Sequence, residues 1–406
     1  MTDADQRSLL YIGGSRSQLS GVRAAREAGL YTVVTDRSED APCAGLADRF
    51  VEVSATDVSH LLALAKEVNR QIPLAGCYGV ADYAFPAIGT IHDELSLSHL
   101  GGRKMFDRTS NKIECRNAWK KEDLPVASAL VFEMSDEVSC MASNAVESLS
   151  LPVVVKPANS HNSRGVTTVS EPDEKIWSTA LEEARAQSDQ VFVETFVEGR
   201  HLNVDGLMVE DGLHPVAVTE RTFVDSIRHQ SRCSLQPASL DESETAEIYA
   251  LAERAAGVLG YRFGPFTVDL ILSQDGPVLL EFSPHFFDPT LNTVRDRGRS
   301  FKAWFSYLAG DCNWSDNLRE PDENMSACCR IFQPRAGVVE HVEGSERLSH
   351  LPGVADIDLL KTEGDTIRNS RGRLDVCGLV WVKADDDASL RNLLAEVRET
   401  LHFRTS

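Results

Sequence analysis

The first hundred residues alternate short apolar runs with amphipathic stretches. Residues 8–12 (SLLYI) predict a buried strand, and a glycine pair follows at 13–14. Apolar positions then recur at helical spacing over 18–29, and the apolar run 30–36 predicts a second strand. Strand, glycine turn, helix and strand form the repeating unit of a doubly wound parallel sheet. We therefore expect a Rossmann-like domain over residues 1–105.

The glycine turn raises the question of a dinucleotide site. Asp36 lies about where such a site places its ribose-binding acid. The turn reads GGSRSQ, however, and lacks the GxGxxG spacing that brings the backbone close to a pyrophosphate. We therefore expect a Rossmann-like scaffold that binds no dinucleotide.

The rest of the chain mixes helices with paired strands and has no evident internal repeat. We expect helices over 113–123, 173–187, 244–260 and 387–401, and a hairpin with arms 151–157 and 165–169. The helix 244–260 places one set of apolar residues on a single face: Ile248, Leu251, Ala252, Ala255 and Leu259. At 406 residues the chain suits several packed α/β units rather than one core.

The segment 266–285 (FTVDLILSQDGPVLLEFSPH) predicts a β-hairpin with chemistry on one face. A three-residue turn, Gln274 to Gly276, would place Asp269 directly opposite Glu281. Ser283 then shares the face of Glu281, because side chains repeat every two residues. Two facing carboxylates repel each other, and a hard cation between them removes that repulsion. Two interpretations are open: the acids bind a metal ion, or both lie on a solvated face.

Two further segments have the character of ligand-binding loops. In VVVKPANSHNSRGV, Lys156 ends an apolar strand, and a small polar loop with Arg164 and Gly165 follows. Such a loop can wrap phosphates with backbone N–H groups, although a lysine at a strand end often only reaches solvent. The segment VFVETFVEGRHLNVDG is a strand that enters an interrupted turn, where free backbone groups could contact an adenine edge. A plain strand–turn–strand is the alternative there.

Composition and charge narrow the range of partners. The formal charge is −21, which disfavours nucleic acid and requires that any polyanion site gather its cations locally. The nine cysteines form no CxxC pair, which fits a reducing compartment. The start has acids where a signal peptide needs bases, and no apolar run is long enough to span a bilayer. We expect a cytoplasmic protein with no membrane partner.

In their order and spacing, these segments resemble the ATP-grasp superfamily, in its carboxylate–amine ligase type. Residues 40–57 resemble the preATP-grasp domain, and the chain from 327 onward resembles the end of biotin carboxylase-like members. Carbamoyl phosphate synthetase-like enzymes share the same nucleotide site. The resemblance implies an α/β fold of four units: a preATP-grasp domain (1–105), a small ATP-grasp subdomain with a phosphate lid (106–200), a large subdomain with the metal site (201–326) and a biotin carboxylase-like subdomain (327–406).

The resemblance also implies ATP and Mg²⁺ as cofactors, with Mn²⁺ as a substitute. Lys112 and Lys156 match the two ATP-binding lysines, and loop 159–165, with Ser163, Arg164 and Gly165, matches the phosphate lid. The hinge that reads the adenine is matched by Glu194, Phe196 and Val197. His201 takes the ribose-facing position. Asp269 and Glu281 match the acids that bridge two magnesium ions, with Ser283 as a further ligand.

The metal strand departs from the family pattern at two positions. Where relatives have Glu-x-Asn-x-Arg, this chain has Glu281-Phe-Ser283-Pro-His285. Serine reaches less far than asparagine, so a water would bridge it to the metal. A histidine can be neutral near pH 7, which makes His285 a weaker catalytic cation than arginine. Arg295 and the arginines at 297 and 299 either replace that cation or form a solvated turn.

The resemblance implies an ATP-dependent ligase that activates a small carboxylate as an acyl phosphate and couples it to an amine. We expect an amino acid or related metabolite among the substrates, with Arg221, Arg228 and Arg232 as candidates to hold its anionic group. A homodimer is compatible with this function. Two alternatives stay open: a bicarbonate-activating carboxylase-type enzyme and a catalytically silent ATP-binding regulatory protein.

Overall fold

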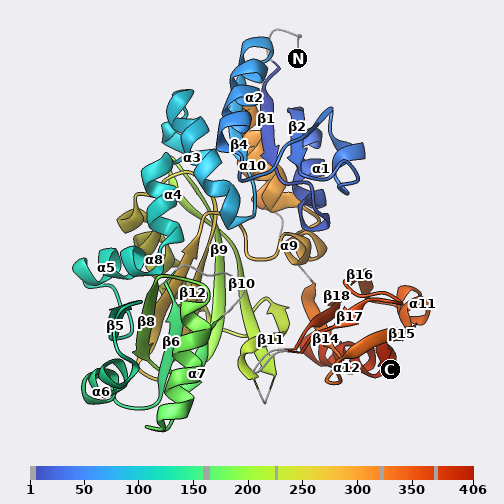
Figure 1. The fold of residues 1–406 in the computed structure, drawn as a ribbon. Helices are drawn as coiled ribbons and strands as arrows, with labels where there is room; N and C mark the ends of the chain where they lie inside the picture. The colour runs from blue at the N-terminus through green and yellow to red at the C-terminus, as the bar shows by residue number, and fades with distance from the viewer. Residues whose placement is uncertain (1–5, 159–164, 225–226, 320–323, 370–373) are drawn as a thin grey trace.

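The computed structural model describes residues 6–158, 165–224, 227–319, 324–369 and 374–406 (Figure 1). Its N-terminal part is a parallel four-stranded sheet in the order β3–β2–β1–β4. The strands are β1 (Ser8–Ile12), β2 (Tyr31–Asp36), β3 (Arg49–Glu52) and β4 (Leu74–Tyr78). Helices accompany them in alternation: α1 (Leu19–Glu27), α2 (Val58–Gln71) and α3 (Phe85–Glu94). The predicted α/β architecture is therefore confirmed.

Asp36 has a structural partner in this sheet. Its carboxylate accepts a hydrogen bond from the Gly14 backbone N–H at 2.8 Å and so fixes the glycine turn after β1. Gly13 has φ of +100°, which favours glycine at that turn. The acid that could have bound a ribose is thus used to hold the turn.

The centre of the molecule is an eight-stranded sheet in the order β13–β12–β9–β10–β11–β14–β18–β16. Its first five strands are β9 (Arg200–Val209), β10 (Gly212–Val224), β11 (Ile227–Gln236), β12 (Gly264–Ser273) and β13 (Gly276–Ser283). The C-terminal part of the chain adds β14 (Met325–Phe332), β16 (Val354–Leu359) and β18 (Val376–Ala384). β11 pairs with β14, with Cys233 opposite Cys329, so one sheet continues from the large unit into the C-terminal lobe.

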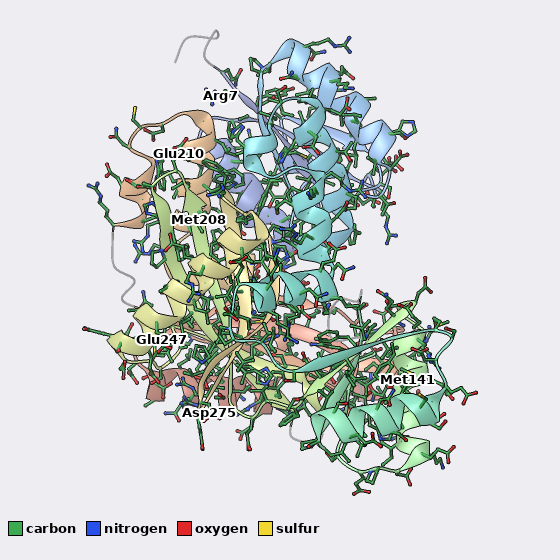
Figure 2. The ribbon with its side chains drawn as sticks, turned by 90° about the vertical axis from the view of Figure 1, so that its left-hand side faces the viewer. Arg7, Met141, Met208, Glu210, Glu247 and Asp275 are labelled. Carbon is green, nitrogen blue, oxygen red and sulfur yellow. The ribbon has the colours of Figure 1, made fainter. Side chains whose placement is uncertain are left out.

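A smaller antiparallel sheet lies at the end of the molecule opposite Arg7, as the labels Met141 and Arg7 show (Figure 2). Its order is β5–β8–β6–β7. The strands are β5 (Ala129–Glu133), β6 (Val153–Pro157), β7 (Thr167–Val169) and β8 (Gln190–Thr195). Helices α6 (Val138–Leu149) and α7 (Glu174–Arg185) share one apolar core with it, in which Trp177 is fully buried.

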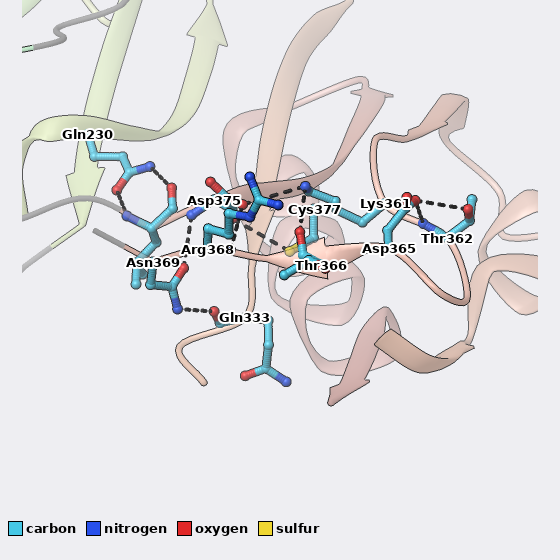
Figure 3. Close-up of polar contacts among 11 residues, drawn as sticks. Gln230, Gln333, Lys361, Thr362, Asp365, Thr366, Arg368, Asn369, Asp375 and Cys377 are labelled. Atoms are coloured by element: carbon cyan, nitrogen blue, oxygen red, sulfur yellow. Dashed lines mark hydrogen bonds and ion pairs between the residues drawn. The ribbon is translucent and has the colours of Figure 1, made fainter. Parts of the chain in front are cut away.

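The C-terminal lobe adds a three-stranded sheet and two helices. Its elements are β15 (Gly337–Glu343), α11 (Ser345–Ser349), β17 (Thr366–Ile367), α12 (Asp387–Thr400) and β19 (His402–Thr405). Gln230 of β11 ties the lobe to the large unit, because its side chain both accepts from the Leu374 N–H at 2.9 Å and donates to the Leu374 carbonyl at 2.5 Å (Figure 3).

The remaining helices pack the units together. They are α4 (Arg103–Ser110), α5 (Lys112–Lys121), α8 (Glu242–Leu259), α9 (Pro289–Asp296) and α10 (Arg299–Ala309). α8 buries the predicted apolar face, and Trp119 of α5 donates to its Ala255 carbonyl at 3.0 Å. α10 packs against α1, where Phe305 contacts the rings of Tyr11 and Tyr78 in the N-terminal part. No helix in the described ranges is both long and apolar enough to cross a bilayer.

Candidate functional site

A cleft of about 880 Å³ lies between the small sheet and the large sheet. Most of the residues predicted for the nucleotide and metal sites line it: Lys112, Lys156, Glu194, Phe196, Val197, His201, Asp269, Glu281, Ser283 and His285. Their positions span residues 112 to 285, so the fold brings together what the sequence separates. Two predicted residues are not in its lining, namely Gly165 and Arg295. Ser163 and Arg164 lie outside the described residues.

Arg295 is used elsewhere in the fold. Its guanidinium donates to the backbone carbonyl of Val216 at 2.5 Å and holds α9 against β10. Arg297 and Arg299 are likewise not part of the cleft lining. None of these three arginines therefore belongs to the cleft lining.

The β12–β13 hairpin places Asp269 directly opposite Glu281, as predicted, but by a different route. Ser273 pairs with Gly276, so the turn has only two residues, Gln274 and Asp275. Such a turn would leave Leu280 opposite Asp269 and turn Glu281 to the other face. A β-bulge between Asp269 and Leu270 in the pairing adds one unpaired residue and restores the opposition of the acids.

The two acids have cationic partners from neighbouring elements. Lys112, the first residue of α5, lies with Nζ 3.2 Å from Glu281 Oε1. Arg221 of β10 lies with Nη2 3.0 Å from Asp269 Oδ2. Asn203 of β9 donates to the other oxygen of Asp269. Each acid is therefore charge-balanced in the free protein.

The pKa values of the two acids move in opposite directions. Burial raises the pKa of Asp269 to about 6, against the opposing effect of Arg221. Desolvation by the cleft walls would also raise the pKa of Glu281, but Lys112 and Lys156 outweigh it and the pKa is lowered. Glu281 therefore ionises more easily than an ordinary glutamate, whereas a further cation near Asp269 would favour its ionised form.

The residues present fit a magnesium ion shared with phosphates. Within the described ranges, no group of three or more His, Cys, Asp and Glu side chains is placed to enclose a metal. Magnesium typically takes one or two carboxylates, with phosphates and waters completing its octahedron. Asp269 and Glu281 would supply the carboxylates and Ser283 a neutral oxygen, and the buried Asn203 Oδ1 has no hydrogen-bond partner in the described structure.

A buried ion cluster lies where the small sheet meets α5. Lys156 Nζ lies 2.6 Å from Glu194 Oε1, and Arg116 Nη2 lies 3.0 Å from Glu194 Oε2. Burial lowers the pKa of Lys156, although Glu194 opposes that shift. Lys156 therefore does not reach solvent at the strand end, and the alternative for this lysine is wrong. Sequence reasoning missed Arg116, which looks like one of several surface cations in the predicted helix 113–123.

The Rossmann-like part also contributes to the cleft. Residues 80–83 line it from the loop after β4, next to the point where the strand order reverses. Asp82 Oδ1 lies 3.9 Å from His285 Nε2, while His285 Nδ1 donates to the Phe286 carbonyl at 2.7 Å. Burial alone would lower the pKa of His285, but Asp82 and this carbonyl outweigh it and the pKa is raised. Ligands of such sheets bind beyond the carboxyl ends of the strands. Asp82 could have been identified in the sequence because it follows shortly after the predicted strand that ends near Tyr78.

β9 carries a polar row that the sequence interpretation treated as an interrupted turn. His201, Asn203 and Asp205 alternate with buried apolar residues and point to one face of the strand. Asp205 accepts from the Phe287 N–H at 2.9 Å and from Asn292 Nδ2 at 2.9 Å, which fixes the segment after the metal strand. The alternation was visible in the sequence, and it could have identified Asn203 and Asp205 as polar positions on one face.

The residues predicted to form the adenine hinge and to face the ribose lie together along one part of the cleft lining. Phe196 donates its backbone N–H to the Pro152 carbonyl at 3.1 Å, and Phe196 and Val197 both line the cleft. His201 packs edge-on against Phe223 at 4.6 Å between ring centres. Arg221 lies beside the ring of Phe223, and Arg232 is not in the lining.

Several known proteins resemble this chain in sequence. Two family models match the chain: "D-ala D-ala ligase C-terminus" over residues 118–284 and "L-amino acid ligase C-terminal domain 2" over residues 330–406. The chain is 24% identical over 415 residues to the uncharacterised protein y4rH of Sinorhizobium fredii, covering 100% of this chain and 84% of that protein. It is 28% identical over 303 residues to a formate-dependent phosphoribosylglycinamide formyltransferase of Synechococcus sp., covering 72% and 74% of the two chains.

Solved structures share the fold over nearly the whole chain. The L-amino acid ligase from Bacillus licheniformis superposes with a TM-score of 0.82 at 16% identity, covering 98% of this chain and 99% of that one. The ADP complex of an N5-carboxyaminoimidazole ribonucleotide synthetase superposes with a TM-score of 0.74 at 19% identity, covering 97% and 98%. These structures therefore share the fold of this chain, and the two matching family models describe ligase domains over residues 118–284 and 330–406.

Proposed function

We propose that this ligase uses ATP and magnesium to activate a small-molecule carboxylate as an acyl phosphate and then joins it to an amine, with an amino acid among its substrates. The observation that carries the proposal is the facing pair Asp269 and Glu281 in a cleft that also contains Lys112 and Lys156. Phosphoryl transfer needs positioned cations around the phosphates and little covalent chemistry from the protein. This cleft provides such groups.

In the first step, an oxygen of the substrate carboxylate attacks the γ-phosphorus, and the bond from that phosphorus to the β,γ-bridging oxygen breaks to release ADP. Magnesium, when bound by Asp269 and Glu281 with help from Ser283, would supply charge neutralisation at the phosphates. Lys112 Nζ lies 3.2 Å from Glu281 Oε1 and so would lie close to phosphates bound at these acids. It stabilises the charge that moves during transfer.

In the second step, the amine nitrogen attacks the acyl carbon and loses a proton, and phosphate leaves with the electrons of the broken C–O bond. Asp82, from the segment after β4, and His285, from the segment after β13, lie 3.9 Å apart in the cleft lining. Arg221 of β10 also lines the cleft, 3.0 Å from Asp269. An amino acid carries both an ammonium and a carboxylate, and the cleft presents groups of both charges to it.

The choice of an amino acid rests on two findings. The C-terminal match is to a domain described as belonging to L-amino acid ligase, and the structure of an L-amino acid ligase superposes over 98% of this chain. A bicarbonate-activating enzyme is the second candidate, because an N5-carboxyaminoimidazole ribonucleotide synthetase shares the fold with a TM-score of 0.74.

A phosphate-release screen tests the proposal. The purified protein is incubated with ATP and Mg²⁺, and with pairs drawn from amino acids, other amines and small carboxylates, with and without bicarbonate. We expect ADP and phosphate to form only when an amino acid is one member of the pair, and product to be detected by mass spectrometry. Phosphate release that requires bicarbonate would select the second candidate, and ATP binding without turnover on any pair would refute both.

Metal dependence is tested in the same assay. Chelation with EDTA should abolish turnover, and added Mg²⁺ or Mn²⁺ should restore it, because both ions accept oxygen ligands in octahedral geometry. Turnover that persists in EDTA would contradict the assignment of Asp269 and Glu281.

A further inference from the structure

The orientation of Glu281 depends on one unpaired residue of β13. From Ser273 to Leu270 the hairpin pairs regularly with Gly276 to Leu279, and the next regular pair would be Asp269 with Leu280. A slip of one residue in a strand moves every later side chain to the opposite face. The bulge at Leu280 is therefore what puts Glu281, and after it Ser283, on the face of Asp269.

A bulged residue leaves backbone groups without a ladder partner, and a buried carbonyl without a partner is costly. In this hairpin the Leu280 carbonyl accepts a hydrogen bond from Arg116 Nε at 2.8 Å. The donor comes from α5, 164 positions earlier in the chain. Arg116 itself is only 4% exposed, so water does not compete freely for the bond.

The same arginine has a second partner in the nucleotide site. Its Nη2 atom pairs with Glu194 Oε2 at 3.0 Å, and its guanidinium lies 5.8 Å from the centre of the Phe192 ring. These contacts hold the planar guanidinium in one orientation, with Nε directed at β13. One turn earlier on α5, Lys112 contacts the carboxylate of Glu281 itself.

The surrounding backbone supports this arrangement. Asn111 caps α5 by accepting from the N–H groups of Ile113 and Glu114 at 2.9 and 3.2 Å. After the helix, the Pro125 carbonyl accepts from the Leu279 N–H at 2.8 Å, next to the bulge. The segment 111–125 thus contacts β13 on both sides of the position where the register changes.

From these contacts we propose that Arg116 is a positioning residue that holds the Leu280 bulge and thereby keeps Glu281 facing Asp269 for metal binding. The inference rests on the metal assignment made in the proposed function. Arg116 does not touch the reacting atoms. Its effect is exerted through the register of β13, and it links the hinge residue Glu194 to the metal strand.

The test compares ATP binding with and without metal, measured by isothermal titration calorimetry in Mg²⁺ and in EDTA. The quantity of interest is the dissociation constant of ATP in EDTA divided by that in Mg²⁺. This ratio measures how much the metal strengthens ATP binding. In Arg116→Leu we expect this ratio to fall about tenfold or more, as for loss of a residue that orients a metal ligand. Arg116→Lys keeps a donor that reaches one of the two partners. We therefore expect this variant to fold, and we expect its ratio to fall less than that of Arg116→Leu.

Arg185→Leu is the matched control. Arg185 also donates to a backbone carbonyl, that of Asp136 at 2.5 Å, but in the small subdomain and outside the cleft lining. We expect its ratio to stay within about twofold of wild type, since no metal ligand depends on it. If both Arg116 variants keep the wild-type ratio, whatever their melting temperatures, the positioning role is overturned. If wild type itself shows no metal-dependent gain, the metal assignment fails first, and with it the proposed function.

Discussion

Removal of the Glu194 carboxylate should destabilise the free protein strongly, because it leaves two buried cations without a counter-ion. The side chains of Arg116, Glu194 and Lys156 are 4%, 6% and 8% exposed, and Glu194 lies 3.0 Å from the first cation and 2.6 Å from the second. Loss of one partner of a buried ion pair costs about 3–5 kcal/mol. Lys156 can relieve part of the cost by losing its proton, since burial already lowers its pKa. We therefore expect about 3 kcal/mol for Glu194→Ala.

The assay is urea unfolding at pH 7, followed by circular dichroism and tryptophan fluorescence. Trp177 is buried in the core that contains β6 and β8, so it reports on the part of the molecule that carries the ion cluster. Unfolding at pH 9 adds an internal check. At pH 9 the loss of unfolding free energy in Glu194→Ala should be smaller than at pH 7. The reason is that a buried Lys156 without its counter-ion loses its proton more easily at the higher pH.

Glu220→Ala is the matched control for this prediction. Glu220 pairs with Arg200 at 2.7 Å on the large sheet, but the two side chains are 27% and 35% exposed. Solvent-exposed pairs contribute about 0–1 kcal/mol, so this variant should lose little. If Glu194→Ala loses no more stability than Glu220→Ala, water reaches the cluster and the reasoning from burial is refuted.

Three further outcomes are expected. Glu281→Gln should reduce phosphate release by about 100-fold or more, since metal-ion stabilisation is worth several kcal/mol. Its urea midpoint should fall by little, because glutamine keeps the shape of the side chain and the ion pair lost with Lys112 involves a carboxylate that is 41% exposed. A near-normal rate would contradict the metal assignment. His285→Arg should preserve or raise phosphate release near pH 8, since arginine stays charged. A collapse in that variant would show that the imidazole has its own role. His92 should make the fold acid-sensitive. It is buried and neutral, accepts from the Cys77 N–H at 3.0 Å and donates to the Gly101 carbonyl at 2.9 Å. Burial lowers the pKa of His92 from 6.5 to about 4. The unfolded chain therefore takes up the proton first, and about 3 kcal/mol of stability present above pH 6.5 is lost as pH falls toward 4. Urea unfolding between pH 4 and 7 checks this, and an equally steep loss in His92→Gln would contradict it.

The hairpin shows how far a sequence argument reaches. The pattern of residues 266–285 correctly predicts two strands with Asp269 opposite Glu281. It assumes a three-residue turn, whereas the chain makes a two-residue turn and leaves Leu280 unpaired in a bulge, and both arrangements pair Asp269 with Glu281. The bulge is held by Arg116 from a distant part of the sequence. Local patterns cannot reveal such a contact, because they specify faces and turns but not the donor that satisfies a displaced carbonyl.

Because local patterns do not reveal contacts between distant segments, the sequence also missed other parts of the fold and of the site. The periodicity of a helix such as α10 shows that it has an apolar face, but not that this face covers Tyr11 and Tyr78 in the N-terminal part. Asp82 becomes a cleft residue only because the N-terminal sheet is placed against the metal strand. Asn203 and Asp205 are different, since their alternation along one strand was readable from the residues alone. Residues positioned by local geometry were predictable, and residues positioned by packing were not.

The charge of the chain gives the arrangement of the cleft a physical reason. With a formal charge of −21, the protein must concentrate cations locally to bind a polyanion, yet unpaired cations in a cleft would repel one another. Lys112 and Arg221 avoid this by pairing with Glu281 and Asp269, the acids proposed to bind metal. On that proposal, a divalent cation that takes the two carboxylates leaves both basic side chains free to turn their charge toward phosphate and substrate. Metal binding and the supply of positive charge to the substrates would then be the same event, so a variant that removes either acid should weaken anion binding as well as metal binding.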